Sequence, residues 1–139
     1  VPNVVPLVEP VRKNPLFLYY EDRFQRPNAF RPDIAVSIDD TIEKKLDALD
    51  AHESQVYEWL PWVDGSLDQV PKDKQKRKEW LKTTRFARPV NDQVRKALEK
   101  WYGKEKAAQI RYAEAFEVTE YGMQPTDEQI RRLFPVVGR

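Results

Sequence analysis

The stretch DDTIEKKLDALDAHESQVYEWL, residues 39–60, decides how the rest of the chain is arranged. Its apolar positions and its histidine recur at steps of three and four residues: Ile42, Leu46, Leu49, His52, Val56 and Trp59. This spacing predicts one continuous amphipathic helix, with His52 on the face that points to the core. Asp39 or Asp40 is expected to cap its start, where a carboxylate also suits the helix dipole. Pro61 is expected to end it, because proline lacks the N–H that an inner turn needs.

Two short segments that precede this helix have the composition of strands. Residues 16–20 form an apolar and aromatic run that predicts a buried strand. Residues 34–38 alternate apolar and small side chains, as a strand or an extended lead-in would. Prolines are concentrated ahead of the helix, so residues 1–33 are expected to be an extended lead-in that contains one strand.

Downstream of residue 60, helical patterns alternate with one strand pattern. The basic segment 72–88 predicts a helix that Pro89 ends, and Asn91 is expected to cap a further helix that stops at Gly103. Residues 72–103 are therefore expected to be helical, and 111–139 to hold a strand and a terminal helix. The remaining expected elements are a helical piece over 104–110, a strand over 112–118, and a last helix opened by the capping box of Thr126 and Gln129 and closed by Pro135.

These elements predict a mostly helical α/β chain with two or three short strands, in which residues 1–139 form a single unit. A lone two-stranded unit is marginal in water, so scattered strands usually extend a sheet whose centre lies elsewhere. We therefore expect the chain to be part of a larger α/β unit. The first residue, Val1, agrees with a chain that was processed or cut from a longer one.

The composition argues against several classes of function. Lys and Arg total 24 against 23 for Asp and Glu, and a net charge of +1 gives no electrostatic reason to expect nucleic acid. The chain has no Cys and one His, so nucleophile triads and most zinc sites have only His52 to draw on. No phosphate-cradling glycine loop occurs. Without an apolar run of membrane-spanning length or a signal peptide, a cytoplasmic protein is expected.

Several consecutive motifs resemble a known enzyme family. They are Phe30-Arg31-Pro32-Asp33-Ile34, Ser37-Ile38-Asp39-Asp40-Thr41, Lys44-Lys45-Leu46-Asp47-Ala48-Leu49 and Ala51-His52-Glu53-Ser54-Gln55. Together they resemble the C-terminal half of the PIG-L/LmbE family, zinc-dependent N-deacetylases that act on N-acetylglucosamine conjugates and similar amides. The resemblance covers about residues 14–60, and residues 111–118 are similar to the family as well.

The resemblance implies a Rossmann-like α/β fold and hydrolysis of an acetamide with the help of zinc. The family's zinc-binding motifs, A-H-P-D-D-E and H-x-x-H, do not occur here, and one His cannot supply them. No catalytic or metal-binding residue is therefore assigned, and the chain alone is expected to be inactive. The implied partners are the N-terminal catalytic half of the same domain, further copies in a homo-oligomer, and an N-acetylated sugar-type small molecule.

The candidate site residues are His52, Ser54 and Gln55. One interpretation is helix packing, with His52 hydrogen-bonded inside a core or an interface. The other is a role on the substrate side, in which the imidazole orients a neighbouring ligand and Gln55, one turn on, bonds the same partner. Trp59 and Trp62 are expected to pack, at a groove or at a contact between protomers.

Other conspicuous charged residues have simpler explanations. Asp39 and Asp40 are expected to be caps rather than acid–base groups or metal ligands. The basic residues of 72–82 are expected to form a solvated helix face, with an anion or lipid-headgroup site as the alternative. Glu114 is expected to be an edge charge or the partner of an Arg.

A function from another class competes with the deacetylase assignment. The chain can instead be a non-catalytic helical module for protein interaction or scaffolding. A stable monomer that unfolds cooperatively would favour the module, whereas exposed apolar surface or obligate assembly would favour the severed half of an enzyme.

Overall fold

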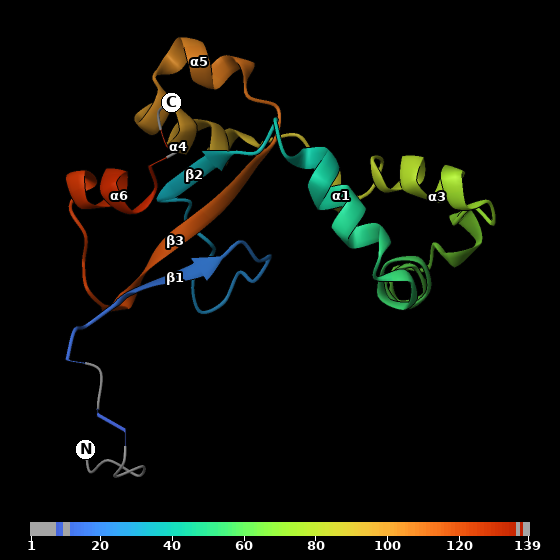
Figure 1. The fold of residues 1–139 in the computed structure, drawn as a ribbon, viewed down its shortest axis with the longest axis horizontal. Coiled ribbons are helices and arrows are strands. Elements are labelled where there is room, and N and C mark those ends of the chain that lie inside the picture. Colours follow the sequence, from blue (N-terminus) through green and yellow to red (C-terminus); the bar gives the residue numbers. More distant parts are fainter. Residues whose placement is uncertain (1–7, 10–11, 136, 138–139) are drawn as a thin grey trace.

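The computed structural model describes residues 8–9, 12–135 and 137, which form two regions. The sheet lobe consists of three strands and α4, α5 and α6, and the helical arm is residues 42–87, which project to one side (Figure 1). In chain order the elements are β1 (Leu16–Tyr20), β2 (Ile34–Ser37), α1 (Ile42–Asp50), the π-helix η1 (Ser54–Trp59), α2 (Leu60–Val63), the 3-10 helix η2 (Leu67–Gln69), α3 (Lys74–Leu81), the 3-10 helix η3 (Arg85–Ala87), α4 (Asp92–Tyr102), α5 (Lys104–Gln109), β3 (Ala113–Gly122) and α6 (Asp127–Leu133).

The sheet is small, three-stranded and antiparallel, with the order β1-β3-β2. Strand β3 is the centre, because it is long enough to pair with both neighbours: Phe116 lies opposite Tyr20 on one side and Ile34 on the other. Among the described residues each strand pairs with another strand of this chain, so this sheet has its own centre in β3. The expectation that the chain belongs to a larger α/β unit stays a prediction. The fold is mixed α/β.

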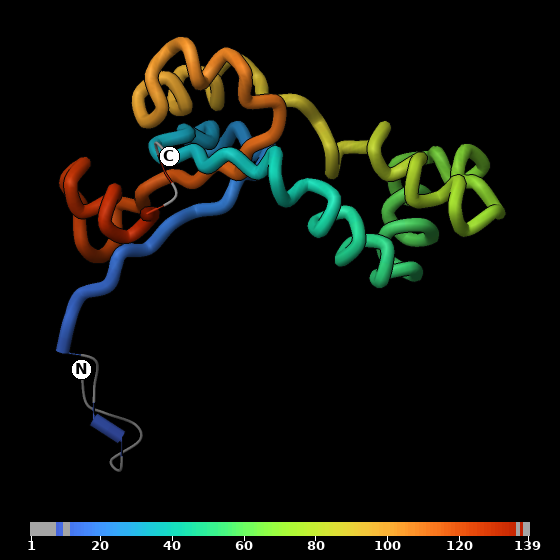
Figure 2. The backbone as a smooth tube through the Cα atoms, turned by 45° about the horizontal axis from the view of Figure 1, so that its top comes forward, coloured from blue at the N-terminus to red at the C-terminus, as the bar shows by residue number. Residues whose placement is uncertain are grey.

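Both faces of the sheet are covered by buried side chains. Helices α4 and α5 lie over one face (Figures 1 and 2), where Leu98 and Ala107 pack on Ala35 and Ala115. A second cluster joins α4, α6 and the strands, and its members are Ile34, Trp101, Ile130 and Val137 with the half-buried Phe116, Val118 and Phe134 packed against them. Burial of this apolar surface is the main favourable term for the lobe.

Asp33 connects the start of β2 to α4 and β3 by hydrogen bonds. Its carbonyl oxygen accepts a hydrogen bond of 2.9 Å from the Trp101 indole, and its carboxylate accepts one of 2.9 Å from the Val118 N–H. The Arg31 side chain completes the set with an ion pair of 2.9 Å. Asp33, which directly precedes β2, thus links this strand to β3 and to α4 through hydrogen bonds.

The helix predicted over 39–60 is broken in the structure. Helix α1 ends at Asp50, and the chain turns at His52 before continuing as the π-helix η1. Pro61 does not end a helix but lies buried in the first turn of α2, where its missing N–H costs little. The end comes at Gly65, whose φ of 68° few other residues adopt.

Neither predicted cap caps α1. The N-cap residue is Thr41, and its side chain makes no capping bond. The Asp39 carboxylate instead accepts hydrogen bonds from the backbone N–H groups of Arg111 (3.0 Å) and Tyr112 (2.6 Å). Asp39 therefore ties the entry of the arm to the start of β3, and Asp40 is exposed.

An ion-pair ladder holds α3 against α1 and η1. Glu43 lies 3.2 Å from Lys82, Asp47 pairs with Lys78, and Glu53 lies 3.3 Å from Arg77. The order is antiparallel, as expected for two helices that run in opposite directions. The basic segment predicted to be a solvated face is therefore partly neutralised by two carboxylates of α1 and by Glu53, the residue before η1. The helix covers 74–81 rather than 72–88. Under the ladder lies a core of Ile42, Leu46, Val56, Tyr57, Leu81 and Ala87.

Several local predictions are confirmed. Asn91 caps α4 by accepting from the Val94 N–H at 2.9 Å, and Gly103 ends that helix with a φ of 79°. Thr126 and Gln129 form the capping box of α6. The strand predicted over 112–118 forms but extends to Gly122.

Candidate functional site

His52 lies at the junction between α1 and η1, with its side chain exposed to solvent. The backbone N–H of His52 donates to the Leu49 carbonyl at 2.9 Å, and the backbone carbonyl of His52 accepts from the Val56 N–H at 2.9 Å. The prediction that His52 faces the core is wrong. The turn after Asp50 interrupts the helical period, and the buried face resumes only at Val56 and Tyr57.

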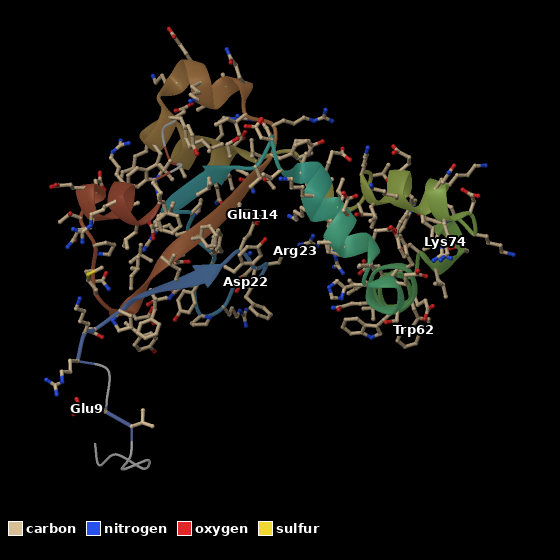
Figure 3. The ribbon with its side chains drawn as sticks, viewed as in Figure 1. Glu9, Asp22, Arg23, Trp62, Lys74 and Glu114 are labelled. Atoms are coloured by element: carbon tan, nitrogen blue, oxygen red, sulfur yellow. The ribbon has the colours of Figure 1, made fainter. Side chains whose placement is uncertain are left out.

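Ser54 and Gln55 lie on the exposed side of the π-helix and line a shallow groove of about 610 Å³. The other lining residues are Glu58, Trp59, Trp62 and Leu67. Trp59 is 55% exposed and Trp62 is 68% exposed. Figure 3 shows Trp62 on the outer surface of the arm, away from the sheet. Both tryptophans line a groove, which was one alternative of the prediction, but neither is packed within this chain. His52 is not among the lining residues.

The π-helix explains how these side chains come together. A π-turn adds a residue per turn relative to an α-helix and is often found at functional sites. Ser54, Gln55 and Glu58 line the same groove as the two indoles, and within the described part of the chain their side chains make no hydrogen bond or ion pair. An apolar floor with polar groups at its rim suits a ligand that has both a hydrophobic face and hydroxyl or amide groups.

Sequence reasoning did not identify Glu58 or Leu67 as part of this groove. Glu58 could have been found from its position, since it lies three residues after Gln55 on the same helical surface. Leu67 belongs to η2, beyond the turn at Gly65, and no local pattern indicates that it returns to the groove.

A second hollow, of about 550 Å³, lies between the sheet lobe and the arm. At its wall the Glu114 carboxylate accepts a hydrogen bond of 2.6 Å from Lys45 on α1 and another from the Tyr20 hydroxyl on β1. Burial, with the bond to Glu114 and its charge, raises the pKa of Tyr20 above its ordinary value. Glu114, shown in Figure 3, thus has a Lys and a Tyr as partners where an Arg was one expectation. The network joins three elements and contains no activated nucleophile.

The family resemblance implies a zinc ion, which would need several His, Cys, Asp or Glu ligands close together. In residues 8–9, 12–135 and 137, no group of three or more His, Cys, Asp or Glu side chains is placed to hold a metal ion. Asp39 is engaged by backbone N–H groups, and His52 points into solvent without further ligands beside it. The described residues therefore do not fit a zinc site.

No helix in the described ranges is both long and apolar enough to cross a membrane. Comparisons of the chain with protein-family models, with curated proteins and with solved structures found no match.

Proposed function

We propose that this chain is the C-terminal portion of a zinc-dependent N-deacetylase of the PIG-L/LmbE type, and that the arm supplies one wall of its substrate cleft. The observation that carries the proposal is the groove on η1. It gathers Ser54 and Gln55, from the motif that resembles the family, with the exposed indoles of Trp59 and Trp62. The resemblance of residues 14–60 supports the same assignment.

On this proposal the residues of the chain bind and orient the substrate. A sugar ring lies with its apolar face against an indole, as expected for a ring that carries C–H groups on one side and hydroxyls at its edge. The Gln55 amide and the Ser54 hydroxyl bond the acetamide or the hydroxyls. The acetamide is hydrolysed at a metal centre that other segments supply, in a Rossmann-like domain completed by the N-terminal half or by further protomers. A cytoplasmic location stays a prediction from the sequence.

Titration with N,N′-diacetylchitobiose, followed by tryptophan fluorescence, tests the groove directly. We expect saturable binding at millimolar ligand that weakens by about tenfold in Trp62→Ala and in Gln55→Ala. Tyr121→Ala is the matched control, because it removes an exposed aromatic side chain from the sheet lobe (63% exposed). Absence of binding up to about 10 mM, or equal loss in the control, would contradict the proposal.

Zinc content and turnover test where the metal centre lies. Elemental mass spectrometry on chelator-free protein is expected to find close to no zinc per chain, and the purified chain is expected not to deacetylate an N-acetylglucosamine substrate. One zinc per chain, or robust turnover, would show that these residues build a metal centre by themselves.

A second candidate function is a non-catalytic interaction or scaffold module. It is favoured by the closure of the chain on itself, since the three strands pair with each other and each region has its own buried core. Sedimentation equilibrium with chemical unfolding distinguishes the two. A monomer with one cooperative transition favours the module, and obligate assembly favours the enzyme portion.

A further inference from the structure

A third hollow, of about 340 Å³, lies on the side of the arm that faces the sheet lobe. Its wall includes Arg23 from the loop after β1, Arg85 from η3, and Arg88 just after η3. The same three arginines also line the hollow that separates the two regions, so the two spaces share this wall. Figure 3 shows Arg23 beside the sheet on the side toward the arm.

These arginines are largely unneutralised, unlike Lys74, Arg77 and Lys78 of α3. Arg85 has one carboxylate near it, Asp64, at 3.8 Å, which is beyond hydrogen-bond distance. In the part of the chain that the structure describes, the guanidinium groups of Arg23 and Arg88 have no ion pair or hydrogen bond. Lys74, Arg77, Lys78 and Lys82 each have a carboxylate partner.

The balance of charged side chains differs between the two hollows. In the smaller hollow, Asp64 is the one carboxylate among the described lining residues, against the three guanidinium groups. In the larger one, Glu114 is engaged by Lys45, and the Asp22 carboxylate accepts a bond from the Phe24 N–H. Glu21 also lines that space. The smaller hollow therefore has an excess of positive charge, whereas in the larger one the three carboxylates nearly balance the four cations.

A guanidinium group presents a planar fork of donors that matches the oxygens of a phosphate group, and it stays charged at all relevant pH. Arg85 is held in place, since its guanidinium carbon lies 5.7 Å from the centre of the Phe86 ring. The volume suits a small molecule rather than a polymer.

We propose that Arg23, Arg85 and Arg88 bind the phosphate group of a small molecule in the smaller hollow, of about 340 Å³. The site is separate from the groove on η1, because no lining residue is shared. The inference therefore does not depend on the proposed deacetylase assignment.

Calorimetric titration of the full chain with inorganic pyrophosphate and with glucose 6-phosphate tests the site. We expect Arg85→Gln and Arg88→Gln to weaken binding by about tenfold each, and Arg85→Lys to restore only part of it because the fork is lost. Lys74→Gln is the control: it removes the same charge from the arm, and Lys74 is 81% exposed and lines neither hollow. Arg88 is exposed, so its variant is expected to keep the wild-type circular dichroism spectrum.

The outcomes separate the possible ligands and can overturn the proposal. Tighter binding of glucose 6-phosphate than of pyrophosphate identifies a sugar phosphate, and the reverse order identifies a diphosphate. No binding of either probe, or equal weakening by Lys74→Gln, would mean that the arginines form no site. Binding of chitobiose should be unchanged in Arg88→Gln, so failure of one proposal leaves the other intact.

Discussion

The sheet lobe and the helical arm are held together by different kinds of contact. In the lobe, hydrogen bonds join residues far apart in the sequence, as between Asp33 and Val118. In the arm, the helices follow each other within residues 42–87 and are held by one small core and a ladder of surface ion pairs. Surface ion pairs contribute little, so the lobe is expected to hold most of the stability. The exposed groove and the unneutralised arginines both involve the arm.

Matched leucine truncations give the largest expected effect. Leu98 in the lobe is fully buried and Leu46 in the arm is 1% exposed. Each Leu→Ala change is expected to cost about 2–5 kcal/mol, because it removes buried methyl groups and leaves a cavity. Hydrogen exchange read by mass spectrometry should show Leu46→Ala opening residues 42–87 alone and Leu98→Ala opening the whole chain. The same protection pattern in both variants would mean that lobe and arm unfold as one unit.

Alanine substitutions at two glycines with positive φ, Gly65 and Gly122, give the next largest expected loss of stability. A Cβ on Gly122 would lie 2.3 Å from the Pro15 carbonyl oxygen, whereas one on Gly65 would meet nothing within 4 Å. Gly65→Ala is expected to cost about 1 kcal/mol from backbone strain alone, and Gly122→Ala about 2–3 kcal/mol more, because β1 must shift as well. Urea unfolding midpoints measure both. A smaller loss of stability in Gly122→Ala than in Gly65→Ala would contradict this, because it would mean that β1 moves away from β3 at little cost.

Alkaline pH is expected to lower the stability of both regions, because each contains a tyrosine whose pKa is raised by folding. Burial and hydrogen bonds to Asp50 and Glu114 raise the pKa of Tyr57 and of Tyr20 above the ordinary value of 10.0. Above pH 10 the unfolded chain therefore loses protons that the folded chain keeps, and stability falls as the pH rises.

Phenylalanine variants assign this loss to each region. Tyr57→Phe, which removes a 2.5 Å bond to Asp50, should cost about 1 kcal/mol at neutral pH and flatten the decline between about pH 9 and pH 11. Tyr20→Phe should do the same more weakly, because Tyr20 is 57% exposed. Urea unfolding at the two pH values checks this, and an undiminished decline in Tyr57→Phe would contradict it.

The ladder between α1 and α3 gives the smallest effect. Lys78→Gln is expected to cost less than about 1 kcal/mol, and added salt at about 1 M should remove most of the difference from wild type. Arg132→Gln, which removes an exposed cation of α6 in the lobe, is the control. A difference from wild type that persists at high salt would mean that Lys78 acts through packing rather than through charge.

Local patterns predicted most elements but not their assembly. The caps at Asn91 and Thr126 and the stop at Gly103 follow from bonds within one helical turn. The same reasoning failed for Asp39, whose carboxylate bonds to backbone groups more than 70 residues later. The prediction that rested on the helical period through His52 is also wrong, because the chain turns after Asp50 and leaves His52 exposed.

The sequence alone determined the caps of α4 and α6, the positions of the strands, and the presence of Ser54, Gln55, Trp59 and Trp62 in one short segment. It could do so because such features depend on dihedral angles and hydrogen bonds between near neighbours. The tertiary structure decided which strand is central, which side of the π-helix faces solvent, and that the arginines of two distant segments share one wall. These outcomes depend on packing between residues that only the folded chain brings together, so no local pattern encodes them.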